Sequence, residues 1–410
     1  MKITLSINKN IGTNIISSLT FIYLIGLYLF SEKIVLLSIL YLVLLCFYGL
    51  IMSRNIKIAI SKFSLCWITY LILGSITTVI VGISNVSDLL DLLASILIAL
   101  TFVVIRINNE YIRLRFKALR TTCIIVLIGC FMQILMPNLL IRLNSMRMGE
   151  TKYRWFMDFF RSGFIVGFSF QTAVTGFYLS LLILFVFCLW VDKKNCYSKW
   201  IKLCLCIVML ISYGFLFFTG KRIFIGLVVI IQLVIYAIYS KKHIFKVLAL
   251  AIGLLTIVYT LFEYTSMGDK LISRITSLDP TRGRSYIYGI LIKSFLERPI
   301  LGNGLASTLK IVTGYSNGHN IYLQILSESG IVGFLIIVPM MIKYAVKNVH
   351  LLIEAISNNR NMFLYSLCLS IQLLFIGWGM TGNPLYDVYP FIVYCIAIGS
   401  IDTIADEEEM

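Results

Sequence analysis

Apolar segments of about 20 residues recur along almost the whole chain and leave room for one kind of fold. They lie at about 15–30, 34–52, 63–83, 89–105, 121–141, 163–191, 200–218, 223–240, 244–262, 321–342, 362–380 and 384–401. A segment of this length crosses a bilayer as an α-helix. Only 13% of the residues are charged, against roughly 25% in a soluble domain, so polar side chains are too few to cover a globule. We therefore expect an all-α membrane protein of about twelve transmembrane helices, in which residues 1–410 form one polytopic membrane domain.

The basic residues of the short loops set the expected orientation, because they concentrate on the cytoplasmic side of a membrane. If the N-terminus is cytoplasmic, the clusters within 106–120, 193–202 and 241–246 all face inward. The even number of expected spans then returns the C-terminus to the cytoplasm. The acidic end, 406–409, is expected to be a solvated, disordered tail.

The net charge of +16 would in a soluble protein point to nucleic acid. Here the basic residues form clusters between apolar segments, and no basic stripe with interleaved aromatic residues stands outside them. This placement is typical of membrane topology and argues against nucleic acid as a partner. Nine of the ten cysteines lie inside apolar segments, so we expect neither a disulfide framework nor a zinc site.

The longest polar interval, 264–320, lies between the ninth and tenth expected spans, and the topology places it outside the cell. From Arg284 to Arg298 apolar residues recur at near-helical spacing until Pro299, which predicts a short amphipathic helix within this outer loop. Arg282 and Arg284 stand at its start. A helix N-terminus attracts anions and arginine grips phosphate oxygens in a planar fork, so this start suits a pyrophosphate.

His319 follows as the only histidine expected on the outer side. It is either a hydrogen-bonded structural residue or a proton acceptor for a hydroxyl nucleophile. Glu328 lies in the tenth expected span, on the opposite helix face from His319, where an ionisable side chain is costly and often functional. We expect Glu328 to pair with an arginine or to bind the backbone of a loop, and Asn320 and Gln324 to line the same cavity.

Two further outer segments carry basic residues against the charge rule. One is 142–162, where the cations contact either lipid headgroups or a substrate phosphate. The other is the short turn Thr219-Gly220-Lys221-Arg222.

Three motifs, taken together in their order, resemble the bacterial O-antigen ligase/polymerase superfamily. They are the turn Thr219-Gly220-Lys221-Arg222; Gly283-Arg284 followed by Phe295-Leu296-Glu297-Arg298-Pro299-Ile300-Leu301-Gly302-Asn303-Gly304; and His319-Asn320 with Leu323, Glu328, Gly330 and Gly333. The spacing from His319 to Gly330 resembles the ligase branch. The Arg-x10-Gly pattern of some polymerases is not found among the outer arginines.

The resemblance implies a metal-independent, inverting glycosyltransferase without a cofactor, embedded in the bacterial plasma (inner) membrane. Its donor and acceptor would be undecaprenyl-diphosphate-linked oligosaccharides, used at an extracytoplasmic active site. Arg222 and Arg284 would hold the diphosphate, and His319 would help activate the acceptor hydroxyl. The other residues expected to bind substrate are Arg282, Lys221, Asn320 and Glu328. Membrane lipid, a chain-length regulator and a repeat-unit flippase are the further partners implied.

Three functions remain open at this point. The leading one is polymerisation of lipid-linked repeat units into O-antigen or capsule-type polysaccharide. The alternative is a ligase that moves the glycan from its lipid carrier to lipid A-core or another acceptor. A transporter or flippase of such glycans is the third, although it would require charged or helix-breaking residues deep in several spans, and the apolar segments are mostly clean.

Overall fold

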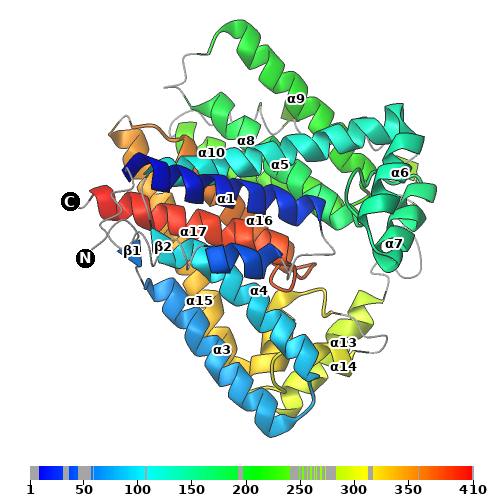
Figure 1. Ribbon diagram of the computed structural model, residues 1–410, viewed down its shortest axis with the longest axis vertical. Helices are drawn as coiled ribbons and strands as arrows, with labels where there is room; N and C mark the ends of the chain where they lie inside the picture. The colour runs from blue at the N-terminus through cyan, green and yellow to red at the C-terminus, as the bar shows by residue number, and fades with distance from the viewer. Residues whose placement is uncertain are drawn as a thin grey trace, which may run out of the picture.

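A computed structural model of the chain describes residues 9–30, 37–44, 57–58, 60–106, 109–192, 197–240, 283–312, 317–358 and 360–408, with isolated positions between 249 and 273. Its helices are α1 (Lys9–Leu29), α3 (Lys62–Val81), α4 (Val86–Val104), α5 (Asn109–Leu135), α6 (Pro137–Arg147), α7 (Glu150–Arg161), α8 (Thr172–Val191), α9 (Lys199–Phe218), α10 (Arg222–Ser240), α13 (Arg284–Glu297), α14 (Thr308–Ile311), α15 (Ile321–Ser357), α16 (Phe363–Gly379) and α17 (Val388–Glu408) (Figure 1). The strands within these ranges are β1 (Lys57–Ile58) and β2 (Ile105–Arg106), a two-residue antiparallel pair. The expected all-α class is confirmed.

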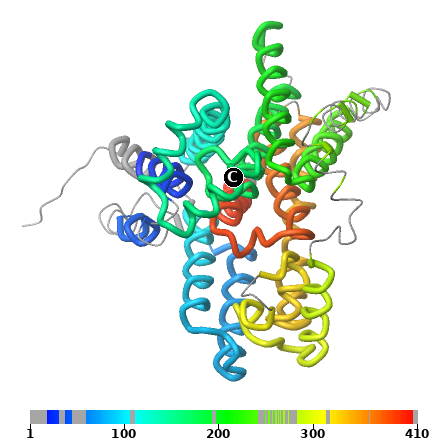
Figure 2. Tube along the Cα trace, turned by 90° about the vertical axis from the view of Figure 1, so that its right-hand side faces the viewer, coloured from blue at the N-terminus to red at the C-terminus, as the bar shows by residue number. Residues whose placement is uncertain are grey.

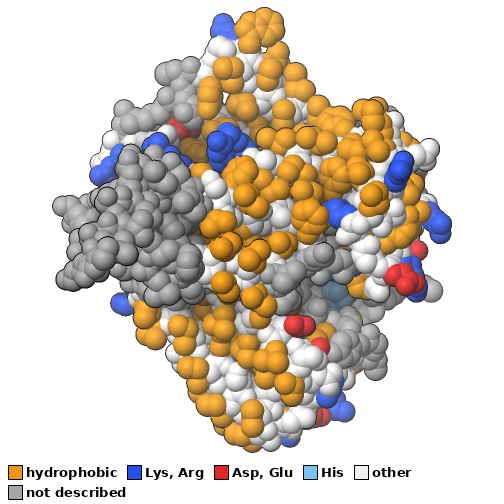
Figure 3. All heavy atoms as spheres, in the orientation of Figure 1, with side chains coloured by type: hydrophobic (Ala, Val, Ile, Leu, Met, Phe, Trp, Pro, Cys, Tyr) orange, Lys and Arg blue, Asp and Glu red, His pale blue; other side chains and the backbone are white. Residues whose placement is uncertain are grey.

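Seven of the described helices are long and apolar enough to cross a membrane, and three shorter apolar helices accompany them at Ser18–Leu29, Phe363–Gly379 and Val388–Ile404. The chain is therefore a multi-pass membrane protein. The expected count of about twelve spans is not confirmed; the segments expected at 34–52 and 244–262 lie mostly outside the described residues. Hydrophobic side chains cover much of the face drawn in Figure 3, as a surface in contact with lipid requires.

Several boundaries differ from the expected ones for identifiable reasons. The basic interval 142–162 is largely helical, forming the end of α6 and the whole of α7. The span expected from 163 begins only at Thr172, because the chain first passes through left-handed Gly163 and Gly167. The span expected to end near 342 continues to Ser357, since Pro339 lies inside the helix without ending it.

Helix α8 forms the centre of the bundle. Its apolar stretch is 89% buried inside the protein, whereas the other six candidate spans are 28–44% buried. It packs against α5, α9, α10 and α16. In Figures 1 and 2 the segment that carries α13 and α14 lies away from this centre, beside α3, α4 and the first part of α15.

The segment 299–304 is inserted into a break in α15. Gly330 adopts φ 61° and ψ −165°, so the helical hydrogen bonding is interrupted there. The backbone N–H groups of Asn303 and Gly304 donate to the carbonyls of Ser327 and Glu328 at 3.0 and 2.8 Å. In return, the carbonyls of Pro299 and Ile300 accept from Ile331 and Val332 at 2.9 and 3.3 Å. Loop backbone thus satisfies the groups that the break leaves open inside the bundle.

Glycine is required on both sides of this contact. A Cβ at Gly330 would lie 2.2 Å from the carbonyl oxygen of Ile300, and one at Gly302 would lie 2.4 Å from the carbonyl carbon of Glu328. The Asn303 side chain adds bonds to the Ser294 carbonyl and hydroxyl at 3.0 and 2.9 Å, which tie α13 to the same place. The turn Gly302-Asn303-Gly304 and the helix break at Gly330 therefore pack against each other.

Gly330→Ala is expected to lower the melting temperature of the detergent-solubilised protein by several degrees, because it adds backbone strain of about 1–3 kcal/mol and a clash with Ile300. Gly214→Ala is the matched control: a methyl group added at this position in α9 would have nothing within 4 Å, so the change should be neutral or stabilising. Equal melting temperatures for the two variants would contradict the importance of the contact between 299–304 and α15 for stability.

Candidate active site

A cavity of about 560 Å³ opens at one end of the bundle. Its wall is supplied by α7, the beginnings of α8, α10, α13 and α17, the end of α16 with the loop that follows it, and the residues just before α15. Its charged and titratable lining residues include Lys152, Lys221, Arg284, His319 and Asp387. Segments more than 200 residues apart in the sequence therefore meet here.

Lys221 reaches the cavity from the tight turn between α9 and α10. The Thr219 hydroxyl donates to the carbonyl of Leu216 at 2.7 Å and accepts from the Lys221 backbone N–H at 3.3 Å. Gly220 takes φ 70° with no room for a side chain, since a Cβ would lie 2.5 Å from the Phe164 ring. The chain reverses within these residues and leaves Lys221 on the cavity wall.

Arg284 is the first residue of α13 and is half-buried. Gly283 before it adopts φ 77°, and no side chain caps this helix start. The helix expected at 284–298 is observed as Arg284–Glu297, but it is not clearly amphipathic: only Leu291 and Ser294 are buried, and apolar Ile292 and Leu296 are exposed. Arg284 lines the cavity, and its guanidinium adds positive charge to this wall.

His319 lies one residue before the N-cap of α15, with the left-handed φ of 52° that is uncommon outside glycine. Its backbone carbonyl accepts a hydrogen bond from the Tyr288 hydroxyl at 3.1 Å, which ties it to α13. Burial lowers the pKa of His319, and the positive charges of Arg284 and Lys221 lower it further. The imidazole is consequently neutral near pH 7 and available as a proton acceptor.

Glu328 lies outside the cavity but is linked to it through two hydrogen-bonded neighbours. Its carboxylate accepts from the Gln324 amide at 2.9 Å and from the Tyr386 hydroxyl, and it also accepts from the Thr308 backbone N–H at 3.4 Å. Gln324 in turn accepts from the Gly318 backbone N–H at 3.0 Å, next to His319. Tyr386 lines the cavity. Glu328 therefore binds loop backbone, as one of its two expected roles, and positions both cavity-lining segments.

The remaining expected site residues lie in different places. Asn320 is the N-cap of α15, and its side-chain oxygen accepts from the backbone N–H groups of Tyr322 and Leu323 at 3.0 and 3.1 Å. Arg222 is the half-buried first residue of α10 and is not among the cavity-lining residues described. Arg282 lies outside the described residues.

Of the cations in the interval 142–162, Arg142, Arg154 and Arg161 are exposed, whereas Arg147 and Lys152 are half-buried. Arg147 donates to the carbonyls of Leu29 and Phe168 and to the Asn144 side chain, so it holds the fold together. Lys152, in contrast, lines the cavity, with its ammonium 5.1 Å from the centre of the Phe170 ring. One cation of this segment is thus placed where it can meet a substrate.

Asp387 is a cavity residue that sequence reasoning did not find. The span expected from 384 onward absorbed it, whereas α17 begins only at Val388 and leaves Asp387 in the preceding loop. A lone carboxylate within an apolar segment is the signal that could have marked it. Desolvation raises the pKa of Asp387 to about 6, against the opposing effects of the Tyr389 backbone N–H and Lys152. Among the described residues, no three His, Cys, Asp or Glu side chains gather in a group that could hold a metal ion.

Comparison with known proteins bears on the same part of the chain. A family model described as O-antigen ligase matches residues 207–338, which include the Lys221 turn, α13 and the first part of α15. No curated protein matches the chain. The match supports the resemblance to the O-antigen ligase/polymerase superfamily that the motifs predicted, and members of this family are membrane enzymes of the glycosyltransferase type.

Asp387→Asn is expected to tighten binding of inorganic pyrophosphate to the purified protein at about pH 7.5 by roughly tenfold or less, because it removes a negative charge from a cationic cavity. Asp387 is ionised above about pH 6 and protonated below it, so the difference from wild type should vanish near pH 5. Asp158→Asn, an exposed acid on α7, is the control and should match wild type at both pH values. A difference for Asp387→Asn that is equal at both pH values would contradict the raised pKa.

Proposed function

We propose that the protein polymerises undecaprenyl-diphosphate-linked oligosaccharide repeat units into O-antigen or capsule-type polysaccharide at the outer face of the bacterial plasma membrane. The observation that carries this proposal is the convergence of Lys221, Arg284 and His319 on one cavity. Two cations beside a neutral imidazole are the groups that a glycosyl transfer from a lipid diphosphate needs. The positive-inside distribution of the short-loop cations supports the outward orientation of this cavity, with both termini cytoplasmic.

In the proposed step, the acceptor hydroxyl oxygen attacks the anomeric carbon of the donor sugar from the face opposite the diphosphate. The new glycosidic bond forms as the bond from the anomeric carbon to the diphosphate oxygen breaks, and that oxygen retains the electron pair. His319 takes the hydroxyl proton. Lys221 and Arg284 offset the charge that develops on the leaving diphosphate, which departs without a general acid.

The two cations have a second role in this proposal. Together with burial, which is the larger cause, they lower the pKa of His319 and favour its unprotonated form before the donor binds. Once an anionic diphosphate occupies the cavity, its charge offsets theirs and makes the imidazole a better proton acceptor. Donor binding and base activation would then depend on the same two side chains.

The ligase alternative uses the same chemistry with lipid A-core or another acceptor, and the His319-to-Gly330 spacing keeps it in consideration. The two differ in cells. Loss of a polymerase leaves surface glycan one repeat long, whereas loss of a ligase leaves full-length polymer on the lipid carrier and none attached. A flippase would show neither reaction in detergent. A repeat-unit flippase and a chain-length regulator are the proposed protein partners of the polymerase.

Arg284→Ala and Lys221→Ala are each expected to reduce chain extension by about 10²–10³-fold, as removal of one preorganised charge-stabilising group does. Because Lys221 lines the cavity and Arg222 is not among the described lining residues, Arg222→Ala should be milder, which reverses the order expected from the resemblance. The measurement is elongation of a lipid-linked repeat unit by purified protein, with surface glycan length in complemented cells as the second readout. Wild-type elongation by both cavity variants would contradict the proposed diphosphate site.

The pH profile gives an independent test of the base. The acid limb of kcat/KM should have an apparent pKa below 6.5, and Lys221→Gln should move it upward, since a positive neighbour of His319 is removed. The acid limb should be measured with and without Lys221→Gln in a protein that also carries Asp387→Asn. Asp387 then no longer titrates in this pH range, and the limb reports on His319. Lys199→Gln, an exposed cation at the start of α9, should leave the limb unmoved. A limb that ignores Lys221→Gln, or a His319→Ala variant that elongates normally, would refute the assignment of His319.

A further inference from the structure

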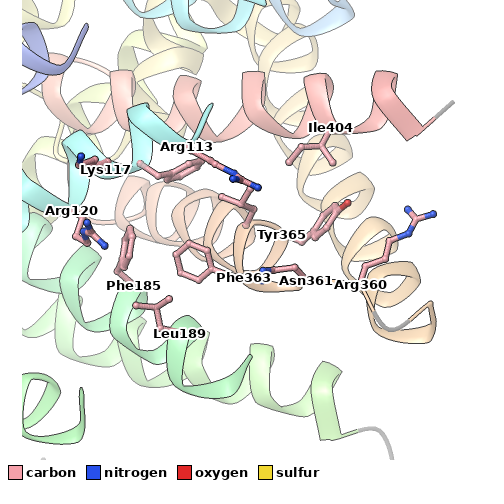
Figure 4. Close-up of a pocket in the computed structure, with 12 residues that line it drawn as sticks. Arg113, Lys117, Arg120, Phe185, Leu189, Arg360, Asn361, Phe363, Tyr365 and Ile404 are labelled. Atoms are coloured by element: carbon pink, nitrogen blue, oxygen red, sulfur yellow. Dashed lines mark hydrogen bonds between the residues drawn. The ribbon is translucent and has the colours of Figure 1, made fainter. Parts of the chain in front are cut away.

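A second cavity, of about 600 Å³, lies at the opposite end of the same helices (Figure 4). It is lined by the start of α5, the last turns of α8, the connection that begins α16 and the end of α17. The candidate active site uses the opposite ends of three of these helices: the start of α8, the end of α16 and the start of α17. The two cavities therefore belong to opposite sides of the membrane, and the second has no part in the proposed reaction.

Four cations surround this second cavity. Arg113, Lys117 and Arg120 follow one another at intervals of four and three residues, which places them along one stripe of α5, and all three are exposed. Arg360 approaches from the connection between α15 and α16, across the cavity in Figure 4. The inward charge bias of the short loops assigns this end to the cytoplasm.

Apolar side chains complete the lining. Phe185 and Leu189 of α8 and Phe363 of α16 lie below the α5 cations in Figure 4, with Arg360 farther across the cavity. The rings of Phe185 and Phe363 pack edge to face at 5.1 Å, so this floor is a fixed surface. A cavity that joins a cationic rim to an aromatic and aliphatic floor fits an anionic amphiphile better than a soluble anion, which would gain nothing from the floor.

We propose that this cavity binds an anionic phospholipid of the cytoplasmic leaflet. The phosphodiester would lie against Arg113, Lys117 and Arg120, and an acyl chain would cover the partly exposed Leu189 and Phe363. Arginine binds phosphate oxygens through two parallel N–H bonds, and basic pockets between helices on the cytoplasmic side are suited to such headgroups. Because the site lies between α5, α8, α16 and α17, bound lipid would stabilise the central bundle.

The acidic end of the chain is the rival occupant. Ile404 lines the cavity, and the acidic residues 406–409 follow it in the sequence. A carboxylate cluster could neutralise the same cations without lipid. Lipid is favoured because the apolar floor offers the tail's charged side chains nothing to bind, and the experiment separates the two occupants.

The test uses the full-length protein in detergent, titrated with short-chain phosphatidylglycerol, phosphatidylcholine or inorganic phosphate, with the melting temperature as readout. Phosphatidylglycerol alone should raise it. Neutralising each of Arg113, Lys117 and Arg120 to Gln should weaken this response about fivefold per charge, from the ~1 kcal/mol that a cation contributes near an anionic membrane surface. The triple variant should not distinguish phosphatidylglycerol from phosphatidylcholine.

The matched control is Lys199→Gln/Lys202→Gln/Lys343→Gln, which removes the same charge from exposed positions on α9 and α15 outside the cavity and should respond like wild type. A triple variant in the cavity that keeps the phosphatidylglycerol response would overturn the proposal, and so would equal protection by inorganic phosphate. If wild type does not respond and a chain ending at Ala405 does, the acidic tail occupies the site and the lipid proposal fails. None of these outcomes depends on glycosyl transfer.

Discussion

The candidate site depends on the backbone hydrogen bonds that the segment 299–304 makes to α15, where Gly330 interrupts the helix. A transmembrane helix that loses its internal hydrogen bonds must find other partners, because no water is available inside the bundle. The segment 299–304 supplies them; it is separated by one residue from the end of α13 and by three residues from the start of α14. One backbone contact thus fixes the position of Arg284, at the far end of α13, and supports the part of α15 that carries His319. The segment 299–304 is held in the helical bundle through main-chain hydrogen bonds.

Around this contact, hydrogen bonds between buried polar side chains link it to the residues that line the cavity. Asn303 ties α13 to α15, and Gln324 and Glu328 tie the residue before His319 to Tyr386. None of these three needs to touch a substrate to matter. They hold two loops that approach from different helices, so that the electrostatic relation between His319 and its two cationic neighbours is set before a substrate binds. Preorganisation of this kind is what a reaction driven by charge stabilisation requires.

Sequence reasoning reached the parts of this arrangement that are encoded locally. The all-α membrane class and the helix starting at Arg284 follow from apolar periodicity, and motif order led to the expectation that Arg284 and His319, which both line the cavity, lie close together. It gave the catalytic role to Arg222 and a lesser, substrate-binding role to Lys221, whereas Lys221 is the one of the two that lines the cavity, because the left-handed turn at Gly220 sets the direction of each side chain. It missed Asp387, since an apolar neighbourhood made the loop look like part of a span. Nor could the sequence show that Gly330 interrupts α15 to receive the backbone of a segment some thirty residues away.

The central claim is that the cavity bounded by Lys221, Arg284 and His319 receives the donor's diphosphate. The most direct measurement is a cryo-electron-microscopy structure of the protein with a non-transferable undecaprenyl-diphosphate-sugar analogue. We predict that the diphosphate oxygens lie within hydrogen-bond reach of the Lys221 ammonium and the Arg284 guanidinium, with His319 facing the anomeric carbon. A diphosphate bound elsewhere, with this cavity empty, would contradict the account.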